Sequence, residues 1–395
     1  MKMNYFILFM EFPFYFPIEK LKDIKTPFYF YDMAVLRKTL DLLTNEANKY
    51  SNYKIHYAIK ANHNPKLLNV IKQYGIGIDT VSGNEILTAI RNGFNPSNIV
   101  FAGVGKTDDE ISVAIDNDIY CFNVESLQEI EVINEIAASK GKTVNICIRV
   151  NPNICAHTHH HITTGLYENK FGICSRDLEK AIQSIISSSH LKFLGFHFHI
   201  GSQMLDLSDF EKLVLFIHDL LETYRSNGIN VKILDVGGGL GVSYTNPNLL
   251  PDFENYFKIF SSLSSKVEEI HFELGRSIIC QCGSLVTKLL YIKQGMERSF
   301  AIVDGGMTEL IRPALYDAYH LVENITHPGN EYEFDVVGPV CESSDVISHS
   351  VKMGDAKRGD YVIIRSAGAY GESMASSYLC RDIPLGYISN EFQDH

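Results

Sequence analysis

The sequence predicts an α/β protein, with a (β/α)8 TIM-type barrel followed by a mostly antiparallel C-terminal β-domain. Three observations predict this fold class. Short apolar runs alternate with helical patterns from about residue 54 onward, the helical patterns begin at capping signals, and both features stop near residue 277. At 395 residues the chain is too long for one ordinary hydrophobic core, so we expect two domains.

Eight short runs have the composition of parallel strands that are buried on both faces, because they are rich in branched and aromatic residues. Parallel strands that alternate with helices are best closed into a barrel, which places chemistry at the carboxyl ends of the strands. In chain order the runs are Ile55–Ile59, Ile76–Val81, Ile99–Val104, Tyr120–Val124, Val144–Val150, Phe193–Ile200, Val231–Val236 and Glu269–Glu273.

The starts of four helices are predicted by the capping-box spacing, in which a hydroxyl and a carboxylate three residues later satisfy free backbone amides. Glycines at 93, 141 and 228 follow helical stretches and are typical of helix ends. Four capping pairs placed just after strands favour a βα repeat. The pairs are Ser82 with Glu85, Thr107 with Glu110, Ser126 with Glu129, and Ser208 with Glu211.

Beyond about Ser277 the strand-like runs are separated by Gly/Pro turns without long helices, which predicts a β-domain. The run Phe28–Tyr31 is also strand-like, and we expect it to pair with the C-terminal sheet. The domain prediction is therefore a barrel over 30–275 and a β-domain over 276–395, joined by an N-terminal strand from 1–29. The C-terminal runs are Phe300–Val303, Glu333–Val337 and Tyr361–Ser366.

Composition and charge exclude several classes of function. A net charge of −12 and a pI near 5.7 argue against a nucleic-acid or anionic-membrane partner. No stretch is long enough to span a membrane, and the apolar N-terminus is interrupted by Glu11, Pro13 and Pro17. The eight cysteines show no CxxC spacing, which argues against a zinc ribbon. We therefore expect a soluble, cytoplasmic protein with reduced thiols.

Lys60 is the first candidate for chemistry, since it lies in Tyr57-Ala58-Ile59-Lys60-Ala61-Asn62 at the end of an apolar run. A lysine at a strand tip can stand in a dry pocket that lowers its pKa and frees an amine for Schiff-base formation. Such a lysine suits pyridoxal phosphate. The alternative is a surface lysine that happens to follow a strand.

A glycine-rich turn, Gly237-Gly238-Gly239-Leu240-Gly241, follows the seventh predicted strand. Backbone amides can approach an anion closely there, and the loop after strand seven of such a barrel is a common phosphate site. The alternative is a purely structural turn. Its position favours a functional interpretation.

His197 and His199 end the sixth predicted strand and are two residues apart, so we expect them on one face. One of them could stack on an aromatic cofactor in the barrel mouth, while Ser202 could bind its phosphate. The alternative is a buried core histidine. Glu273 and Arg276 close the eighth strand, and a carboxylate there can keep a pyridine nitrogen protonated.

The cluster His157-Thr158-His159-His160-His161 invites a metal interpretation. Adjacent histidines point in divergent directions, and no carboxylate lies at a ligand spacing from them. We therefore predict no metal and assign the cluster no role.

Several ordered motifs resemble those of the diaminopimelate decarboxylases, a family in the alanine-racemase-like barrel class of pyridoxal phosphate enzymes. The match runs from roughly residue 25 to 388, with Leu274 where the family usually has Pro. The motifs are Tyr57–Asn62, Asn169–Gly172, His199–Gln203, Gly237–Gly239, Asp304–Met307, Arg312–Tyr316, Gly338–Ser343 and Gly368–Gly371.

The resemblance implies a role for each matched residue. Lys60 would carry pyridoxal 5'-phosphate as an internal aldimine, with Asp79 managing protons, His199 stacking on the ring and Glu273 pairing with its nitrogen. The residues implied to hold the phosphate are Ser202, Gly238, Gly239, Gly275 and Arg276, with Tyr370 closing the site. The residues implied to contact substrate are Arg276, Arg312, Tyr316, Glu342 and Tyr370.

The implied reaction is decarboxylation of meso-2,6-diaminopimelate to L-lysine and CO2, the last step of lysine biosynthesis. Loss of CO2 leaves a carbanion that the cofactor ring delocalises. Cys341 would then donate the proton, with Cys341 and Glu342 entering from the second subunit of a homodimer. A small buried thiol is the alternative for Cys341.

Rival functions remain open. An ornithine or arginine decarboxylase would share the fold, although ornithine enzymes resemble Cys-Asp where this chain has Cys341-Glu342-Ser343, and Arg312 offers the extra arginine that a distal carboxylate would need. Alanine racemase is more distant, because it lacks the Cys-Glu pair. A decarboxylase-like regulator that only binds a partner is the rival from another class, and the intact Lys60 and Cys341 speak against it.

Overall fold

The computed structural model describes residues 16–152, 154 and 170–392. The described residues separate into two compact units, one drawn from 40–241 and 252–275 and the other from 1–39, 242–251 and 276–395. The domain boundaries at 30–275 and 276–395 stay a prediction beside this division. No helix in the described part is long and apolar enough to cross a bilayer.

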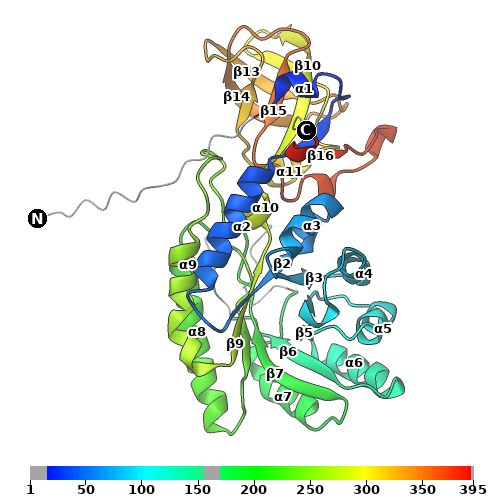
Figure 1. Cartoon of the computed structure of the whole chain (residues 1–395), viewed down its shortest axis with the longest axis vertical. Coiled ribbons are helices and arrows are strands. Elements are labelled where there is room, and N and C mark those ends of the chain that lie inside the picture. Colours follow the sequence, from blue (N-terminus) through cyan, green and yellow to red (C-terminus); the bar gives the residue numbers. More distant parts are fainter. Residues whose placement is uncertain (1–15, 153, 155–169, 393–395) are drawn as a thin grey trace, which may run out of the picture. The chain divides into compact units, whose positions relative to one another are not determined.

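The first unit, here called the barrel unit, contains a closed barrel of parallel strands in the order β2 to β9. Its helices α4 to α7 lie outside the strands in Figure 1. The strands are β2 (Tyr53–Ala58), β3 (Gly77–Thr80), β4 (Ile99–Phe101), β5 (Cys121–Val124), β6 (Val144–Arg149), β7 (Leu191–His197), β8 (Ile233–Asp235) and β9 (Glu269–Leu274). The helices are α3 (Pro65–Lys72), α4 (Gly83–Arg91), α5 (Asp108–Asp116), α6 (Leu127–Ser139), α7 (Leu178–Ile186), α8 (Ser208–Ser226) and α9 (Phe253–Ile259).

Each of the eight predicted strands overlaps one barrel strand, so the predicted fold class is confirmed. The strands are buried because helices cover them, and β3 and β5 are buried along their whole length. The strand predicted over Phe193–Ile200 ends early, at His197. His199 therefore lies beyond the strand, and strand periodicity does not fix its direction.

Three of the four predicted caps are confirmed. Ser82, Thr107 and Ser126 each accept a hydrogen bond from the backbone amide three residues later, and Thr107 forms the complete reciprocal box with Glu110. The prediction for Ser208 is wrong. This serine is the first residue of α8, and its own amide donates to Asp206 Oδ1 at 2.9 Å.

The second unit, here called the β-unit, contains an eight-stranded sheet. Its path runs β12-β15-β10-β11-β13-β14, with β1 paired to β10 and β16; the pairs β11–β13 and β1–β16 are parallel and the others are antiparallel. The strands are β1 (Phe28–Tyr31), β10 (Gly283–Gln294), β11 (Ser299–Val303), β12 (Val322–Asn324), β13 (Tyr332–Val337), β14 (Val346–Met353), β15 (Tyr361–Ile364) and β16 (Gly386–Ile388).

Short helices complete the described chain. The β-unit holds α1 (Ile18–Leu21), α10 (Arg276–Ile279) and α11 (Arg312–Tyr316), and the residues of α2 (Met33–Ala47) are divided between the two units. A buried cluster of aromatic and branched residues forms the core around β1 and β15. Its members are Leu21, Phe28, Phe30, Val286, Tyr361 and Ile363.

Candidate functional site

Lys60 lies in a 3-10 turn, η1 (Ile59–Ala61), at the carboxyl end of β2. Its Nζ donates a hydrogen bond to Asp79 Oδ2 on the neighbouring strand β3, over 2.8 Å. Parallel pairing aligns Ala58 with Asp79, which brings the lysine two residues later to the level of this carboxylate. The barrel thus holds an amine and a carboxylate side by side at its carboxyl end, as expected for a barrel site.

The two partners of this ion pair differ in burial. Asp79 is fully buried, whereas the Lys60 side chain keeps 37% of its exposure. Burial and the Glu273 carboxylate raise the pKa of Asp79, the Lys60 ammonium opposes both effects, and the resulting pKa is about 7. The Asp79 carboxyl therefore titrates near neutral pH and can hold or release a proton beside the Lys60 amine.

Glu273 ends a polar network inside the barrel. Its Oε2 lies 3.1 Å from His197 Nε2, and its Oε1 accepts from Asn123 Nδ2 over 3.1 Å. Asp235 forms a further side-chain hydrogen bond with Glu273. These side chains come from β5, β7, β8 and β9 and are at most 6% exposed. The network fixes the position of the Glu273 carboxylate.

The two acids of this network have opposite charge states. Burial acts to raise the pKa of Glu273, but His197, Lys60 and the Asp235 hydrogen bond together hold it well below its ordinary value. Burial and the Glu273 charge raise the pKa of Asp235 far above its ordinary value. Asp235 is therefore the protonated donor, and Glu273 stays an anion.

His199 is a neutral ring with one defined tautomer. The Gly238 amide donates to His199 Nδ1 over 3.3 Å, so the ring proton is assigned to Nε2. Burial and the nearby cations Arg149 and Lys60 together lower the pKa of His199 to about 3. A neutral aromatic ring is suited to packing against another ring. Ser202, three residues later, is partly buried.

The glycine-rich loop is packed against neighbouring backbone. A Cβ on Gly238 would lie 2.0 Å from the Glu273 carbonyl oxygen, and one on Gly239 would lie 2.6 Å from the Gly201 oxygen. Gly275 is also tight, since a Cβ there would lie 3.0 Å from Ala61 Cβ. Neighbouring protein atoms leave no room for a Cβ at Gly238 and Gly239 and little room at Gly275, which explains the glycines in these positions.

The predicted substrate residues and Arg276 belong to the β-unit. Arg276 begins α10 and is 7% exposed. Its Nη1 donates to Tyr244 Oη over 2.6 Å, and its guanidinium carbon lies 4.9 Å from the centre of the Tyr370 ring. Tyr370 has a positive φ of 56°. Two tyrosines thus hold this guanidinium in place.

Arg312 is also buried, with 5% exposure, at the start of α11. Its guanidinium carbon lies 5.0 Å from the centre of the Tyr244 ring, and its Nη1 lies 2.9 Å from His320 Nε2. No carboxylate among the described residues forms an ion pair with Arg312. Tyr316, at the other end of α11, is partly buried.

Cys341 and Glu342 lie in the loop between β13 and β14, and both are exposed. The Tyr378 hydroxyl donates to Glu342 Oε1 over 2.6 Å. Asp345 anchors the loop by accepting from the amides of Val340 and Met307, over 2.7 and 2.6 Å. The thiol is therefore carried on a fixed loop at the surface of this chain.

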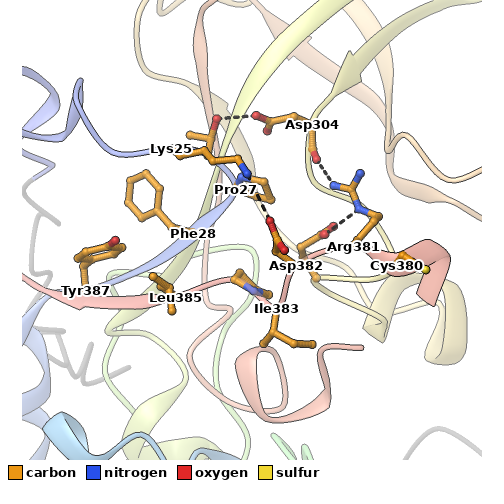
Figure 2. Close-up of a pocket in the computed structure, with 13 residues that line it drawn as sticks. Lys25, Pro27, Phe28, Asp304, Cys380, Arg381, Asp382, Ile383, Leu385 and Tyr387 are labelled. Carbon is orange, nitrogen blue, oxygen red and sulfur yellow. Dashed lines mark hydrogen bonds and ion pairs between the residues drawn. The ribbon is translucent and has the colours of Figure 1, made fainter. Parts of the chain in front are cut away.

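A hollow of about 420 Å³ in the β-unit is lined by none of the predicted site residues. Figure 2 shows that its charged side chains pair within the wall. Arg381 donates to Glu309 Oε1 and to the Asp304 carbonyl, over 3.0 and 2.6 Å, and Lys25 donates to Asp382.

His197, Asp235 and Glu273 place ligand-type atoms within 4.8 Å of one another. Hydrogen bonds between these groups explain their proximity, because Glu273 accepts from both of the others. The cluster His157–His161 lies outside the described residues. We therefore assign no metal to the described part of the chain.

Sequence reasoning missed Asn123, Tyr244 and His320. Tyr244 follows the last glycine of the loop by three residues, and His320 follows the matched motif Arg312–Tyr316 by four. The closeness of Tyr244 and His320 to these motifs in the sequence could have identified them. Asn123 had none, because an asparagine inside an apolar strand becomes noticeable only when its partner across the barrel is known.

The barrel unit fits the pyridoxal phosphate that the sequence resemblance implies. Lys60 supplies an amine, and the glycine loop supplies close backbone. A carboxylate has about four acceptor positions, and Asn123, His197 and Asp235 use three of those on Glu273. The fourth acceptor position of Glu273 is left for the N–H of the cofactor's pyridine ring.

Comparison with known proteins points the same way. Residues 36–287 match the family model described as pyridoxal-dependent decarboxylase, pyridoxal binding domain. The chain is 51% identical to the diaminopimelate decarboxylase of Bacteroides thetaiotaomicron, over 95% of this chain and 98% of that one. It is 38% identical to the Aquifex aeolicus diaminopimelate decarboxylase, over 92% and 86%.

A solved structure of a close relative has the same fold throughout. The crystal structure of diaminopimelate decarboxylase from Helicobacter pylori, complexed with L-lysine, superposes with a TM-score of 0.89 at 38% identity and covers 94% of this chain and 93% of that one. The resemblance noted in the sequence is confirmed. This chain belongs to the diaminopimelate decarboxylase family of pyridoxal-dependent decarboxylases.

Proposed function

We propose that this enzyme uses pyridoxal 5'-phosphate to decarboxylate meso-2,6-diaminopimelate to L-lysine and CO2, the last step of lysine biosynthesis. The observation that carries the proposal is the Lys60–Asp79 pair at the carboxyl end of the barrel. The Lys60 amine lies beside the Asp79 carboxyl group, which titrates near neutral pH. The names of the relatives specify the substrate.

The barrel residues bind and orient the cofactor. Lys60 holds it covalently through its amine, His199 packs on its ring, and Glu273 accepts from its ring nitrogen. When bound, the cofactor supplies an electron sink for the electron pair that CO2 leaves behind. Because Glu273 stays an anion, it favours a protonated ring nitrogen. The phosphate is bound by Ser202 and by backbone at Gly238, Gly239, Gly275 and Arg276, with Tyr370 closing the site.

The β-unit residues bind the substrate. Arg276 and Arg312 offer buried guanidinium groups to its distal carboxylate, and Glu342 accepts from its distal ammonium. Tyr316 and Tyr370 contact the substrate. Arg312 supports this assignment most strongly, because a buried cation without a carboxylate partner among the described residues favours an anionic ligand.

Cys341 donates the proton that replaces CO2, and it acts in the site of a partner subunit. Its exposure, and that of Glu342, support a role across an interface of a cytoplasmic homodimer. A thiol donor has to be accessible to another chain if the site is shared.

The test is CO2 release by the purified enzyme from meso-diaminopimelate, L-ornithine and L-arginine, with pyridoxal phosphate present. We expect release from diaminopimelate at least ~10⁴-fold more efficiently in kcat/KM, because ornithine and arginine leave buried guanidinium groups unpaired. Preferential release from ornithine or arginine would replace the proposal with the rival decarboxylase. No release from any of them, with no visible absorbance from bound cofactor, would revive the regulator.

A further inference from the structure

The Arg312 guanidinium is held by neutral groups. Its described partners are the His320 imidazole at 2.9 Å and the Tyr244 ring at 5.0 Å. A buried cation is usually paired with an anion, since burying it alone is costly. The positive charge of Arg312 is therefore available to bind an anionic ligand.

His320 has a fixed tautomer that makes it an acceptor for Arg312. Its Nδ1 lies 2.9 Å from the Arg365 carbonyl oxygen, which can only accept, so Nδ1 carries the proton. Its Nε2 is then the unprotonated nitrogen that faces Arg312 Nη1. Burial together with the Arg312 and Arg276 charges lowers the pKa of His320 to about 3, and the ring stays neutral at working pH.

The backbone fixes where His320 stands. α11 ends at Asp317 in the left-handed conformation, with φ 50°, and the Asp317 amide donates to the Arg312 carbonyl. This turn reverses the chain direction toward Arg312, the first residue of α11. The Arg365 amide donates to the Leu321 carbonyl over 2.9 Å, at the end of the β12–β15 pair, so His320 is anchored beside Arg365.

Tyr244 links the two arginines. Its hydroxyl accepts from Arg276 while the face of its ring lies beside Arg312, and the His320 ring packs edge-on against it with centroids 5.1 Å apart. A neutral ring between two cations favours both of them electrostatically. A carboxylate in either position would neutralise a guanidinium and compete with an anionic ligand.

We propose that His320 is a positioning residue that aims the Arg312 guanidinium without neutralising it, and so determines selectivity for ligands that carry the distal carboxylate. This inference rests on the proposed function. It adds a residue that binds no substrate atom itself and acts only through Arg312.

Two amino-acid substitutions separate the two hydrogen bonds of His320. Asparagine places an N–H near the position of Nδ1 and lacks the acceptor at Nε2, so His320→Asn keeps the bond to Arg365 and loses the bond to Arg312. Glutamine places an acceptor near Nε2, so His320→Gln is the rescue variant. His349→Gln serves as the matched control, because this histidine lies in the same unit with a side chain that is 62% exposed.

The probes are L-lysine, which keeps the distal carboxylate of diaminopimelate, and cadaverine, which lacks it. Their dissociation constants are measured by calorimetry on the pyridoxal phosphate-loaded enzyme, together with kcat and KM for diaminopimelate. For His320→Asn we expect the L-lysine dissociation constant to rise about 10-fold or more, as for loss of a hydrogen bond to a charged group. Cadaverine binding should change less than about twofold, and KM should rise more than kcat falls.

Recovery of L-lysine binding in His320→Gln, with His349→Gln unchanged, completes the expected result. Equal weakening of both probes in His320→Asn, or no weakening of either, would overturn the inference. If His320→Asn does not fold, His320→Leu, which loses both hydrogen bonds, is compared with the wild type on the same two probes. Failure of the proposed function is visible separately, as a wild-type enzyme that releases no CO2 from diaminopimelate.

Discussion

Lys60 Nζ and Asp79 Oδ2 are 2.8 Å apart, with the carboxylate fully buried and the amine at the edge of the interior. Burial and the Glu273 charge favour the protonated acid, while Lys60 favours the ionised one. The charge on Asp79 is therefore finely balanced near neutral pH.

The Asp79→Asn variant should remove a pH dependence from stability. An acid with a raised pKa binds its proton more tightly in the folded protein, so its contribution to the free energy of unfolding is greatest at low pH. That contribution is lost as pH rises from the ordinary pKa of 3.8 to about 7. Urea unfolding of cofactor-free protein measures this. The wild type should lose stability relative to Asp79→Asn across that window, and a constant difference would contradict the assignment.

Lys60→Ala should abolish covalent attachment of pyridoxal phosphate, because Lys60 supplies the amine. The measurement is borohydride reduction followed by peptide mass analysis. Lys54→Ala is the matched control, since Lys54 is an exposed lysine of the same strand β2 and should label like the wild type. Label on a peptide with another lysine would sink the assignment.

Mixing Lys60→Ala with Cys341→Ala subunits should restore activity that neither variant has alone. In a two-fold symmetric dimer with shared sites, one of the two sites of each mixed dimer is intact, so equal random mixing gives roughly a quarter of wild-type activity. Subunit exchange is verified with two affinity tags. No recovery after exchange would place Lys60 and Cys341 in the same chain's site.

Arg312→Met should lower kcat/KM for diaminopimelate by about 10²-fold or more and have much less effect on ornithine. The reason is that only diaminopimelate has a distal carboxylate for this buried guanidinium. Equal losses on both substrates would refute the role of Arg312. Steady-state CO2 release with each substrate makes the comparison.

Gly238→Ala should destabilise the protein by roughly 1–3 kcal/mol, because its Cβ would lie 2.0 Å from the Glu273 carbonyl oxygen. Cofactor affinity should fall as well, since the Gly238 amide also holds His199. Gly105→Ala is the control, as nothing lies within 4 Å of its Cβ. We expect that variant within about 0.5 kcal/mol of wild type in urea unfolding. A similar loss in both would contradict the steric argument.

The barrel was predictable because its signals are local. An apolar run such as Cys121–Val124 and a cap such as Thr107 with Glu110 are determined by neighbours in sequence. The failure at Ser208 has the same origin, because Asp206 is a competing local acceptor that the pattern did not weigh. Local rules decide which element forms, and competing local groups decide where it starts.

The site was only partly predictable, because much of it depends on contacts between distant residues. Lys60, Glu273 and Arg312 could be singled out from motifs. The hydrogen bond from Asn123 to Glu273 joins residues 150 apart, and no pattern along the chain reports it. His320 lies only eight residues from Arg312, but its role depends on the left-handed turn at Asp317 and on β15.

The absence of a described carboxylate beside Arg312 links the stability of this protein to its occupancy. A buried guanidinium without a counter-charge destabilises the ligand-free fold. Any ligand whose carboxylate reaches it offsets that desolvation cost, and such a ligand binds the native state alone. At equal concentrations the thermal midpoint should therefore climb further with L-lysine than with cadaverine, which brings no carboxylate to Arg312. In a cell, accumulated L-lysine would then occupy the site and, because it stabilises the fold, lengthen the lifetime of the enzyme.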